Sequence, residues 1–166
     1  MKQALHIAVV TVSDTRTEET DKSGAVLIDF LTEEGHQLKH KSIVKDDVYG
    51  LRAEASNLIN NPAIQVILMT GGTGFTDRDN TMVAIKPLFD SEIEGFGELF
   101  RQLSFDEIGT STIQSRVCAG IANGTIIFCL PGSPGACNTG WHKIIKQQLD
   151  STFKPCNFVS KLKSVQ

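Results

Sequence analysis

The sequence from residue 64 to residue 74 reads Ile64-Gln65-Val66-Ile67-Leu68-Met69-Thr70-Gly71-Gly72-Thr73-Gly74. Its first six residues form a short, mainly apolar run, which is typical of a strand buried in a sheet. The next five contain three glycines, and glycine permits the backbone conformations that a sharp turn out of a strand requires. This stretch therefore predicts a buried strand that ends in a tight loop.

Two other apolar runs end in the same abrupt way. Leu5–Val12 is rich in β-branched residues and stops at Ser13-Asp14, and Thr125–Leu130 stops at Pro131–Gly135. The remaining elements are a more exposed strand at Leu38–Val44 and helices from Asp21 or Ser23 to Gly35, at Tyr49–Asn60, Thr81–Phe89, Gly97–Leu103 and Cys137–Leu149. Strands that alternate with helices predict an α/β fold, a three-layer α/β/α sandwich around a mostly parallel sheet.

The bulk composition is that of a globular chain, with 166 residues of which 40% are hydrophobic and 21% charged. This length fits one domain, residues 1–166, with a core of 6–154 and a C-terminal tail of 155–166. A formal charge of −3 argues against nucleic-acid binding, which needs a basic face. The apolar stretch Ile7–Val12 is too short to span a membrane, so no membrane partner is expected.

The cysteines carry no sign of a metal or disulfide framework. There are four of them, at positions 118, 129, 137 and 156, and none forms a C-x-x-C pair. A structural zinc site is therefore not expected. Thiols without a signal peptide fit a reducing compartment, so the sequence predicts a cytoplasmic protein.

The glycine-rich loop is the strongest local indication of function. Glycines let backbone N–H groups approach an anion closely, and the two threonines add hydroxyl donors. On that hypothesis a Gly72→Val substitution should abolish ligand binding and leave the fold largely intact. The loop lacks the lysine of a Walker motif and the spacing of a dinucleotide fingerprint. A purely structural strand-to-helix turn remains the alternative.

Acidic residues follow several of the predicted strands. Ligands bind open α/β sheets beyond the carboxyl ends of the strands, where Asp46, Asp79 and Ser13-Asp14 are expected to converge. Two carboxylates there suit Mg²⁺, which takes one or two carboxylates and substrate phosphates. The alternative is that each Asp caps a helix or closes a turn, Asp79 at the helix near Thr81. Arg78 is a cation that could neutralise a phosphate, or could simply be solvated.

Together these pieces resemble the molybdopterin-binding family that includes MoaB, MogA and the G domain of gephyrin. The likeness covers about His6 to Lys154. It rests on Thr11-Val12-Ser13-Asp14, Lys22-Ser23-Gly24, Asp46, Thr70–Gly74 with Asp79 and Thr81, and Pro131-Gly132-Ser133-Pro134. Three segments resemble the short MoaB branch, namely Glu94–Arg101, Gly109–Thr112 and Lys154–Phe158.

The resemblance implies a role in molybdenum cofactor biosynthesis. It implies that the protein binds molybdopterin and transfers AMP to it from ATP with Mg²⁺, or else that it binds or carries molybdopterin without turnover. Carried over by position, Asp46 and Asp79 are the catalytic carboxylates and metal ligands. The pterin and its phosphate are assigned to Thr70, Gly71, Gly72, Thr73, Gly74 and Ser133, and the nucleotide to Ser13 and Asp14.

The resemblance also implies a homo-oligomer, a trimer or a hexamer, which requires a shared apolar surface. The segment Ile93–Phe105 is the candidate, because its apolar side chains outnumber those that a short helix usually buries by itself. The alternative is that the same side chains close the core of the domain.

Overall fold

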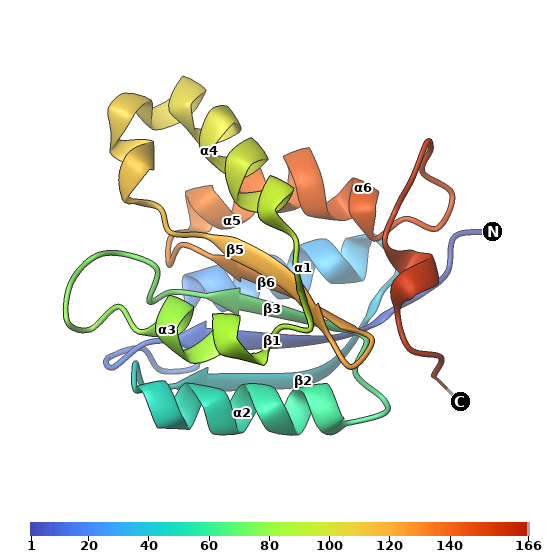
Figure 1. The fold of residues 1–166 in the computed structure, drawn as a ribbon, viewed down its shortest axis with the longest axis horizontal. Coiled ribbons are helices and arrows are strands. Elements are labelled where there is room, and N and C mark those ends of the chain that lie inside the picture. Colours follow the sequence, from blue (N-terminus) through green and yellow to red (C-terminus); the bar gives the residue numbers. More distant parts are fainter. Residues whose placement is uncertain (166) are drawn as a thin grey trace.

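The protein is built on a six-stranded sheet with the strand order β2-β1-β3-β6-β5-β4 (Figure 1). This computed structural model describes residues 1–165. The four parallel strands are β1 (His6–Val12), β2 (Gln37–Val44), β3 (Val66–Thr70) and β6 (Thr125–Leu130). The short strands β5 (Cys118–Ala122) and β4 (Ser91–Glu92) extend one edge by antiparallel pairing.

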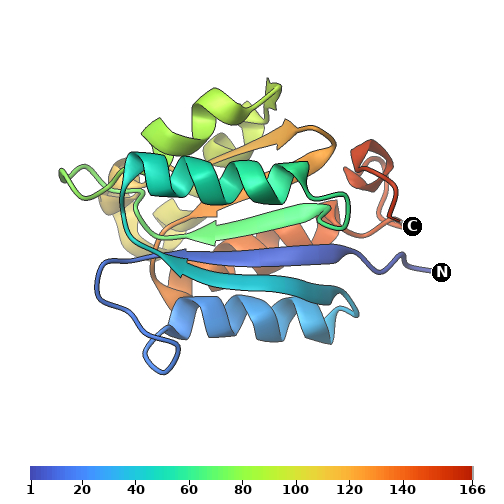
Figure 2. The same cartoon turned by 90° about the horizontal axis from the view of Figure 1, so that it is seen from below.

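Helices cover both faces of this sheet. The first face carries α1 (Lys22–Glu33), α4 (Glu94–Ile108) and α5 (Pro134–Gly140), and α5 continues through a π turn (Trp141–Ile145) into α6 (Lys146–Gln148). The second face carries α2 (Val48–Asn60) and α3 (Thr81–Ile85), with α2 lying along the sheet in Figure 2. The expected three-layer α/β/α fold is confirmed.

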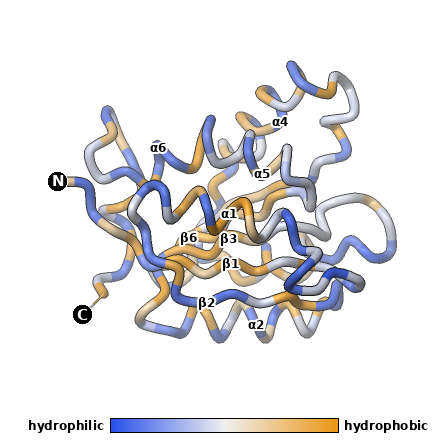
Figure 3. Tube along the Cα trace, turned by 180° about the vertical axis from the view of Figure 1, so that it is seen from behind, coloured by the Kyte–Doolittle hydropathy of each residue, from blue (hydrophilic) through white to orange (hydrophobic). Residues whose placement is uncertain are grey.

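Alternating side chains of each strand pack into two hydrophobic cores, one on each face of the sheet. Ile7 and Val9 of β1 pack with α1, whereas Ala8 and Val10 pack with α2, because successive strand residues point to opposite faces. The central strands are accordingly buried on both faces, and Figure 3 shows them as the most continuously hydrophobic part of the chain. The loops at the carboxyl ends of these strands are therefore anchored to buried, regular structure.

The strand β5 was not expected from the sequence. Its residues, CAGIA, are small and show no regular alternation, so they carry a weak strand signal. The turn that joins it to β6 is Asn123-Gly124, with φ of 49° and 70°, as in the two-residue turns that close antiparallel hairpins. This dipeptide was the available signal for the hairpin.

The helix α4 is longer than expected and divides the candidate interface segment Ile93–Phe105. Phe96 and Phe100 are buried in the core of the first face, at 3% and 1% exposure. Leu99, Phe105 and Ile108 are exposed, but Leu99 lies beside the buried Phe96 and Phe128, whereas Phe105 lies on the opposite side of the helix from Phe96. Phe100 therefore belongs to the domain core, and only part of the segment is free to meet a partner.

The C-terminal tail also packs more closely than its polar composition suggested. Val159 is buried at 8% exposure, and Phe158 packs against the core of the first face. The amide of Lys163 donates a 2.8 Å hydrogen bond to the carbonyl of Gly124.

Within residues 1–165, no helix has the length and apolar character needed to cross a membrane.

Candidate functional site

The site lies at the carboxyl ends of the parallel strands, on the left of Figure 1. The loops that follow β1, β3 and β6 meet there, because parallel strands end at the same edge of the sheet. A small cavity of about 70 Å³ lies between these loops. It is lined by Thr11, Val12, Ser13, Arg16, Asp21, Ser23, Thr70 and Gly132.

The glycines of the loop after β3 are needed by the protein's own packing. Gly71 has a φ of 108°, and a Cβ on it would lie 2.3 Å from the carbonyl oxygen of Val12. Gly72 has a φ of 65°, and its Cβ would lie 2.4 Å from Thr81 Oγ1. The expectation that Gly72→Val leaves the fold intact is therefore wrong, since the added side chain has no room.

The loop also offers free donors to a ligand. The amide of Gly71 donates to the carbonyl of Leu130 at 2.9 Å, whereas those of Gly72 and Thr73 donate to no acceptor within residues 1–165. Adjacent free amides in such a turn form the concavity that binds anions. The expected hydroxyl donor of Thr70 is not offered, because this fully buried side chain donates to the carbonyl of Pro131 at 2.8 Å.

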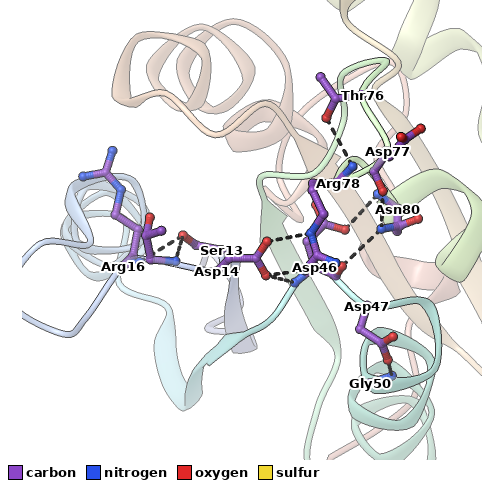
Figure 4. A network of polar contacts seen from close by, with 11 residues as sticks. Ser13, Asp14, Arg16, Asp46, Asp47, Gly50, Thr76, Asp77, Arg78 and Asn80 are labelled. Atoms are coloured by element: carbon purple, nitrogen blue, oxygen red, sulfur yellow. Dashed lines mark hydrogen bonds and ion pairs between the residues drawn. The ribbon is translucent and has the colours of Figure 1, made fainter.

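Asp46 is a buried carboxylate at the end of β2, with 4% of its surface exposed. Its Oδ1 accepts a 2.8 Å hydrogen bond from the amide of Asn80, and its carbonyl accepts one of 3.1 Å from Asn80 Nδ2 (Figure 4). Its Oδ2 lies 2.8 Å from the point where Gly72 would carry a Cβ. It caps no helix: Asp47 caps α2 by accepting from the amide of Gly50.

Asp79 is placed on the other side of the glycine-rich loop. Its Oδ2 accepts hydrogen bonds from the amide and the hydroxyl of Thr76, at 2.9 and 2.7 Å. The same oxygen lies 2.7 Å from where Gly74 would carry a Cβ. Burial works to raise the pKa of Asp79, but the hydrogen bonds and the charge of Arg116 hold it below its ordinary value. Asp79 does not cap α3, because Asn80 occupies the N-cap position, but it does close a turn with Thr76, as the alternative expected.

Asp14 is held in an ion pair with Arg78. Arg78 Nε and Nη2 donate to the two carboxylate oxygens of Asp14, at 2.8 and 2.7 Å (Figure 4). Asp14 Oδ1 also accepts from the amide of Asp46 at 3.1 Å. The hydrogen bond from Arg78, followed by that from Asp46, lowers the pKa of Asp14. Both oxygens of this predicted nucleotide-binding carboxylate are therefore engaged within the protein.

The two predicted serines each hold a loop in shape. Ser13 Oγ accepts from the amides of Thr15 and Arg16, at 3.2 and 3.0 Å. Ser133 caps α5 by accepting from the amide of Ala136 at 3.2 Å. Both hydroxyl hydrogens have no acceptor within residues 1–165, so each serine can still donate to a ligand.

Arg116 is a site residue that the sequence did not indicate. Its Nη2 donates to the carbonyl of Asp79 at 3.0 Å, and its amide donates to the carbonyl of Thr73 at 3.2 Å. Its guanidinium lies over the ring of Phe75, 4.6 Å from the centroid. Arg116 thus fixes the loop that carries the free amides. It lies more than 35 residues from that loop along the chain, so no local pattern could reveal it.

Comparisons with known proteins agree with this geometry. A family model described as "Probable molybdopterin binding domain" matches residues 8–151. Molybdenum cofactor biosynthesis protein B of Escherichia coli (strain K12) is 54% identical over 157 residues, which cover 95% of this chain and 92% of the relative. The protein of the same name in Bacillus subtilis (strain 168) is 46% identical over 142 residues, 85% of this chain and 84% of the relative.

Solved structures give the same result. A crystal structure of molybdenum cofactor biosynthesis protein B matches with a TM-score of 0.86 and 42% identity, covering 89% of this chain and 92% of the other. The tungsten cofactor synthesizing protein MoaB from Pyrococcus furiosus matches with a TM-score of 0.78 and 37% identity, covering 87% and 92%. The family expected from the motifs is thus confirmed, and the chain belongs to the molybdopterin-binding domain family of molybdenum cofactor biosynthesis proteins.

Proposed function

We propose that this protein binds molybdopterin and adenylylates it with Mg-ATP in the cytoplasm. In this reaction a terminal phosphate oxygen of molybdopterin attacks the α-phosphorus of ATP. The new P–O bond forms as the bond from the α-phosphorus to the bridging oxygen breaks, and pyrophosphate leaves. The chemistry requires positioning of two phosphates and neutralisation of their charge, which loops of amides and cations provide.

The observation that carries this proposal is the position of the two carboxylates. Asp46 and Asp79 flank the glycine-rich loop, beside Gly72 and Gly74 respectively. They follow different strands, β2 and β3, so the fold brings them to two positions along one loop at the same edge of the sheet. A loop that only turned the chain would not need acidic residues on both of its sides.

The same residues fit Mg²⁺. Within residues 1–165, no group of three or more His, Cys, Asp and Glu side chains is arranged to hold a metal ion. Mg²⁺ does not need such a group, since it binds through one or two carboxylates and completes its shell with phosphate oxygens and water. Asp46 Oδ2 accepts no hydrogen bond from the described residues. Asp46 and Asp79 would hold the ion, which supplies charge neutralisation when bound.

The proposal is tested by incubating the protein with molybdopterin, ATP and Mg²⁺ and assaying for adenylylated molybdopterin and pyrophosphate. Asp79→Asn should lower kcat about 100-fold or more, because it removes the charge but keeps an acceptor for Thr76. Asp77→Asn is the matched control: Asp77 is exposed, and its side chain accepts no hydrogen bond within residues 1–165. Equal activity in the two variants would contradict the catalytic role.

A second candidate is a molybdopterin-binding or carrier protein without turnover. It is favoured by the hydrogen bonds that both carboxylates already receive, from Asn80 and from Thr76. On this account Asp79→Asn weakens the loop and lowers the affinity for molybdopterin, and no adenylylated product forms with any variant. The same assay separates the two candidates, because only the first gives pyrophosphate.

We also propose that the protein forms a closed trimer, or a hexamer of two trimers, through the exposed C-terminal part of α4 and the turn that follows it. Phe105 and Ile108 are 53% and 51% exposed there, and Ile113 beyond the helix is 72% exposed. Sedimentation should show an oligomer for the parent and a folded monomer for Phe105→Asp. Phe100→Asp is not a usable test, because Phe100 lies in the core. A concentration-independent monomer for the parent would contradict the proposal.

A further inference from the structure

We propose that Arg78 is the phosphate-binding side chain of this site. Asp14 holds its guanidinium at the rim of the site, between the loops that follow β1 and β3, until a ligand phosphate takes the place of the carboxylate. This inference rests on the proposed function, since it needs a phosphate-bearing ligand at these loops. On this proposal Asp14 competes with the ligand phosphate for Arg78, whereas the family resemblance implied that Asp14 contacts the nucleotide.

The ion pair has the geometry of an exchangeable contact. Arg78 lies on the loop between β3 and α3, and Asp14 lies on the loop after β1, 64 residues away. The ion pair is bidentate: Nε and Nη2 of Arg78 each donate a hydrogen bond to a different carboxylate oxygen of Asp14. The Arg78 side chain is 61% exposed and that of Asp14 is 33% exposed. Water and ligands can therefore reach both partners.

A phosphate can replace this carboxylate without any change in the donor geometry. The guanidinium is planar and remains charged, and its paired N–H groups fit two oxygens of a carboxylate or of a phosphate equally well. A phosphate carries more negative charge than the carboxylate that it displaces. The three N–H groups of Arg78 that do not bind Asp14 remain available to further phosphate oxygens.

The charge balance of the rim favours this exchange. Besides Asp14, the carboxylates of Asp46 and Asp47 lie near Arg78 (Figure 4), and their charges would repel an anion. The other two arginines beside the site donate to backbone carbonyl groups and not to a carboxylate. Arg16 Nη1 donates to the carbonyl of Thr20 at 3.1 Å, and Arg116 is held between Asp79 and Phe75. Arg78 is thus the guanidinium whose acceptor is a displaceable side chain.

Asp14 also connects the rim to the catalytic carboxylate. Its Oδ1 accepts from the amide of Asp46 at 3.1 Å as well as from Arg78. When Arg78 moves to a phosphate, Asp14 keeps the contact with the amide and continues to position the backbone of Asp46. We therefore regard Asp14 as a positioning residue that competes with the ligand for Arg78.

Two substitutions give predictions of opposite sign, read by calorimetric titration with ATP and, separately, with molybdopterin. Arg78→Ala should weaken binding of the phosphate ligand about 10- to 100-fold, because a charge-assisted contact is lost. Asp14→Asn should tighten binding several-fold, because the side chain that competes with the ligand for Arg78 loses its charge.

Two further variants serve as comparisons. Arg78→Lys should recover only part of the affinity, since an ammonium group cannot form the bidentate contact. Lys39→Ala, which removes an exposed charge on β2, should leave the affinity within about twofold.

Each outcome has a definite meaning once thermal unfolding has shown that the variants are folded. Tighter binding by Asp14→Asn together with weaker binding by Arg78→Ala supports the exchange. Weaker binding by Asp14→Asn would overturn it and make Asp14 a direct ligand contact, and an unchanged affinity in Arg78→Ala would also overturn it. If the parent binds neither ATP nor molybdopterin, the proposed function itself fails.

Discussion

The two ends of the parallel sheet use polar side chains for different purposes. At the amino end, His36 and Gln65 are 5% and 3% exposed, and both bond to neighbouring backbone. The Nδ1 of His36 accepts from the amide of Leu5, and Gln65 bridges the amide of His6 and the carbonyl of Lys163. Both ends carry ion pairs, but the side chains of Arg78 and Asp14 at the carboxyl end are 61% and 33% exposed, against 26% and 20% for Lys2 and Glu34 at the amino end.

This difference shows which end is built for stability and which for binding. Figure 1 places both termini at the amino end, where the tail closes the sheet by packing and backbone hydrogen bonds. Contacts buried in this way are costly to break. The carboxyl end keeps two free amides and an exchangeable ion pair. Substitutions of exposed polar side chains at the carboxyl end should therefore affect binding, and substitutions of buried polar side chains at the amino end should affect stability.

The largest effect is expected from a matched pair of glycines, one at each end. Gly72 and Gly35 both have positive φ, but a Cβ on Gly35 meets no atom within 4 Å, whereas one on Gly72 meets Thr81 and Asp46. Gly72→Ala should lower the free energy of unfolding by roughly 2 to 5 kcal/mol, from backbone strain plus overpacking. Gly35→Ala should cost only the strain, about 1 to 2 kcal/mol. Equal losses in urea unfolding would show that close approach at Gly72 is unimportant.

The second effect is a pH dependence of stability that comes from the amino end. Burial, followed by the charge of Lys2, lowers the pKa of His36 from 6.5 to about 4, although Glu34 and Asp150 oppose this. Between these values the unfolded chain binds a proton that the folded protein does not. Stability should therefore fall as the pH drops from 6.5 towards 4, by at most about 3 kcal/mol.

The variant that tests this dependence is His36→Asn, whose side-chain oxygen can accept from Leu5 without titrating. Urea unfolding of the parent and the variant at a series of pH values should show a steep loss of stability in this window for the parent only. An identical slope in both proteins would assign the dependence to other groups.

The third and smallest effect concerns Gln65 and should appear in stability but not in binding. Gln65→Ala leaves the amide of His6 and the carbonyl of Lys163 without their partner, at a cost of about 2 kcal/mol. Gln3→Ala, an exposed change at the same end, should stay within about 0.5 kcal/mol. The affinity of either variant for ATP should match that of the parent. A weakened affinity in Gln65→Ala would mean that the two ends are coupled.

Much of the fold could be predicted because its signals are local. The apolar run before Thr70 and the one ending at Val12 correspond to strands of the structure, since burial on both faces leaves a continuous pattern. The small residues of β5 left no such pattern, and the length of α4 exceeded the prediction. The rule that ligands bind at the carboxyl ends of strands was enough to predict that Asp14, Asp46 and the glycine-rich loop lie together.

The roles of individual side chains depended on contacts that no local pattern contains. Gly71 must be glycine because the carbonyl of Val12, 59 positions earlier, lies against it. The hydroxyl of Thr70 donates to the carbonyl of Pro131, 61 positions later, so it is not the free donor that was expected. The sequence could therefore predict which residues gather at the site, but not which of their atoms remain free.

Hydrogen–deuterium exchange with and without molybdopterin and Mg-ATP can show whether ligand binds at the carboxyl end of the sheet. We expect ligand at ten times its Kd to slow exchange at Gly72 and Thr73 about tenfold, because both amides become hydrogen-bonded. The tail around Val159 should exchange as before. Unchanged exchange at Gly72 and Thr73 in the presence of bound ligand would mean that the ligand binds elsewhere on the protein.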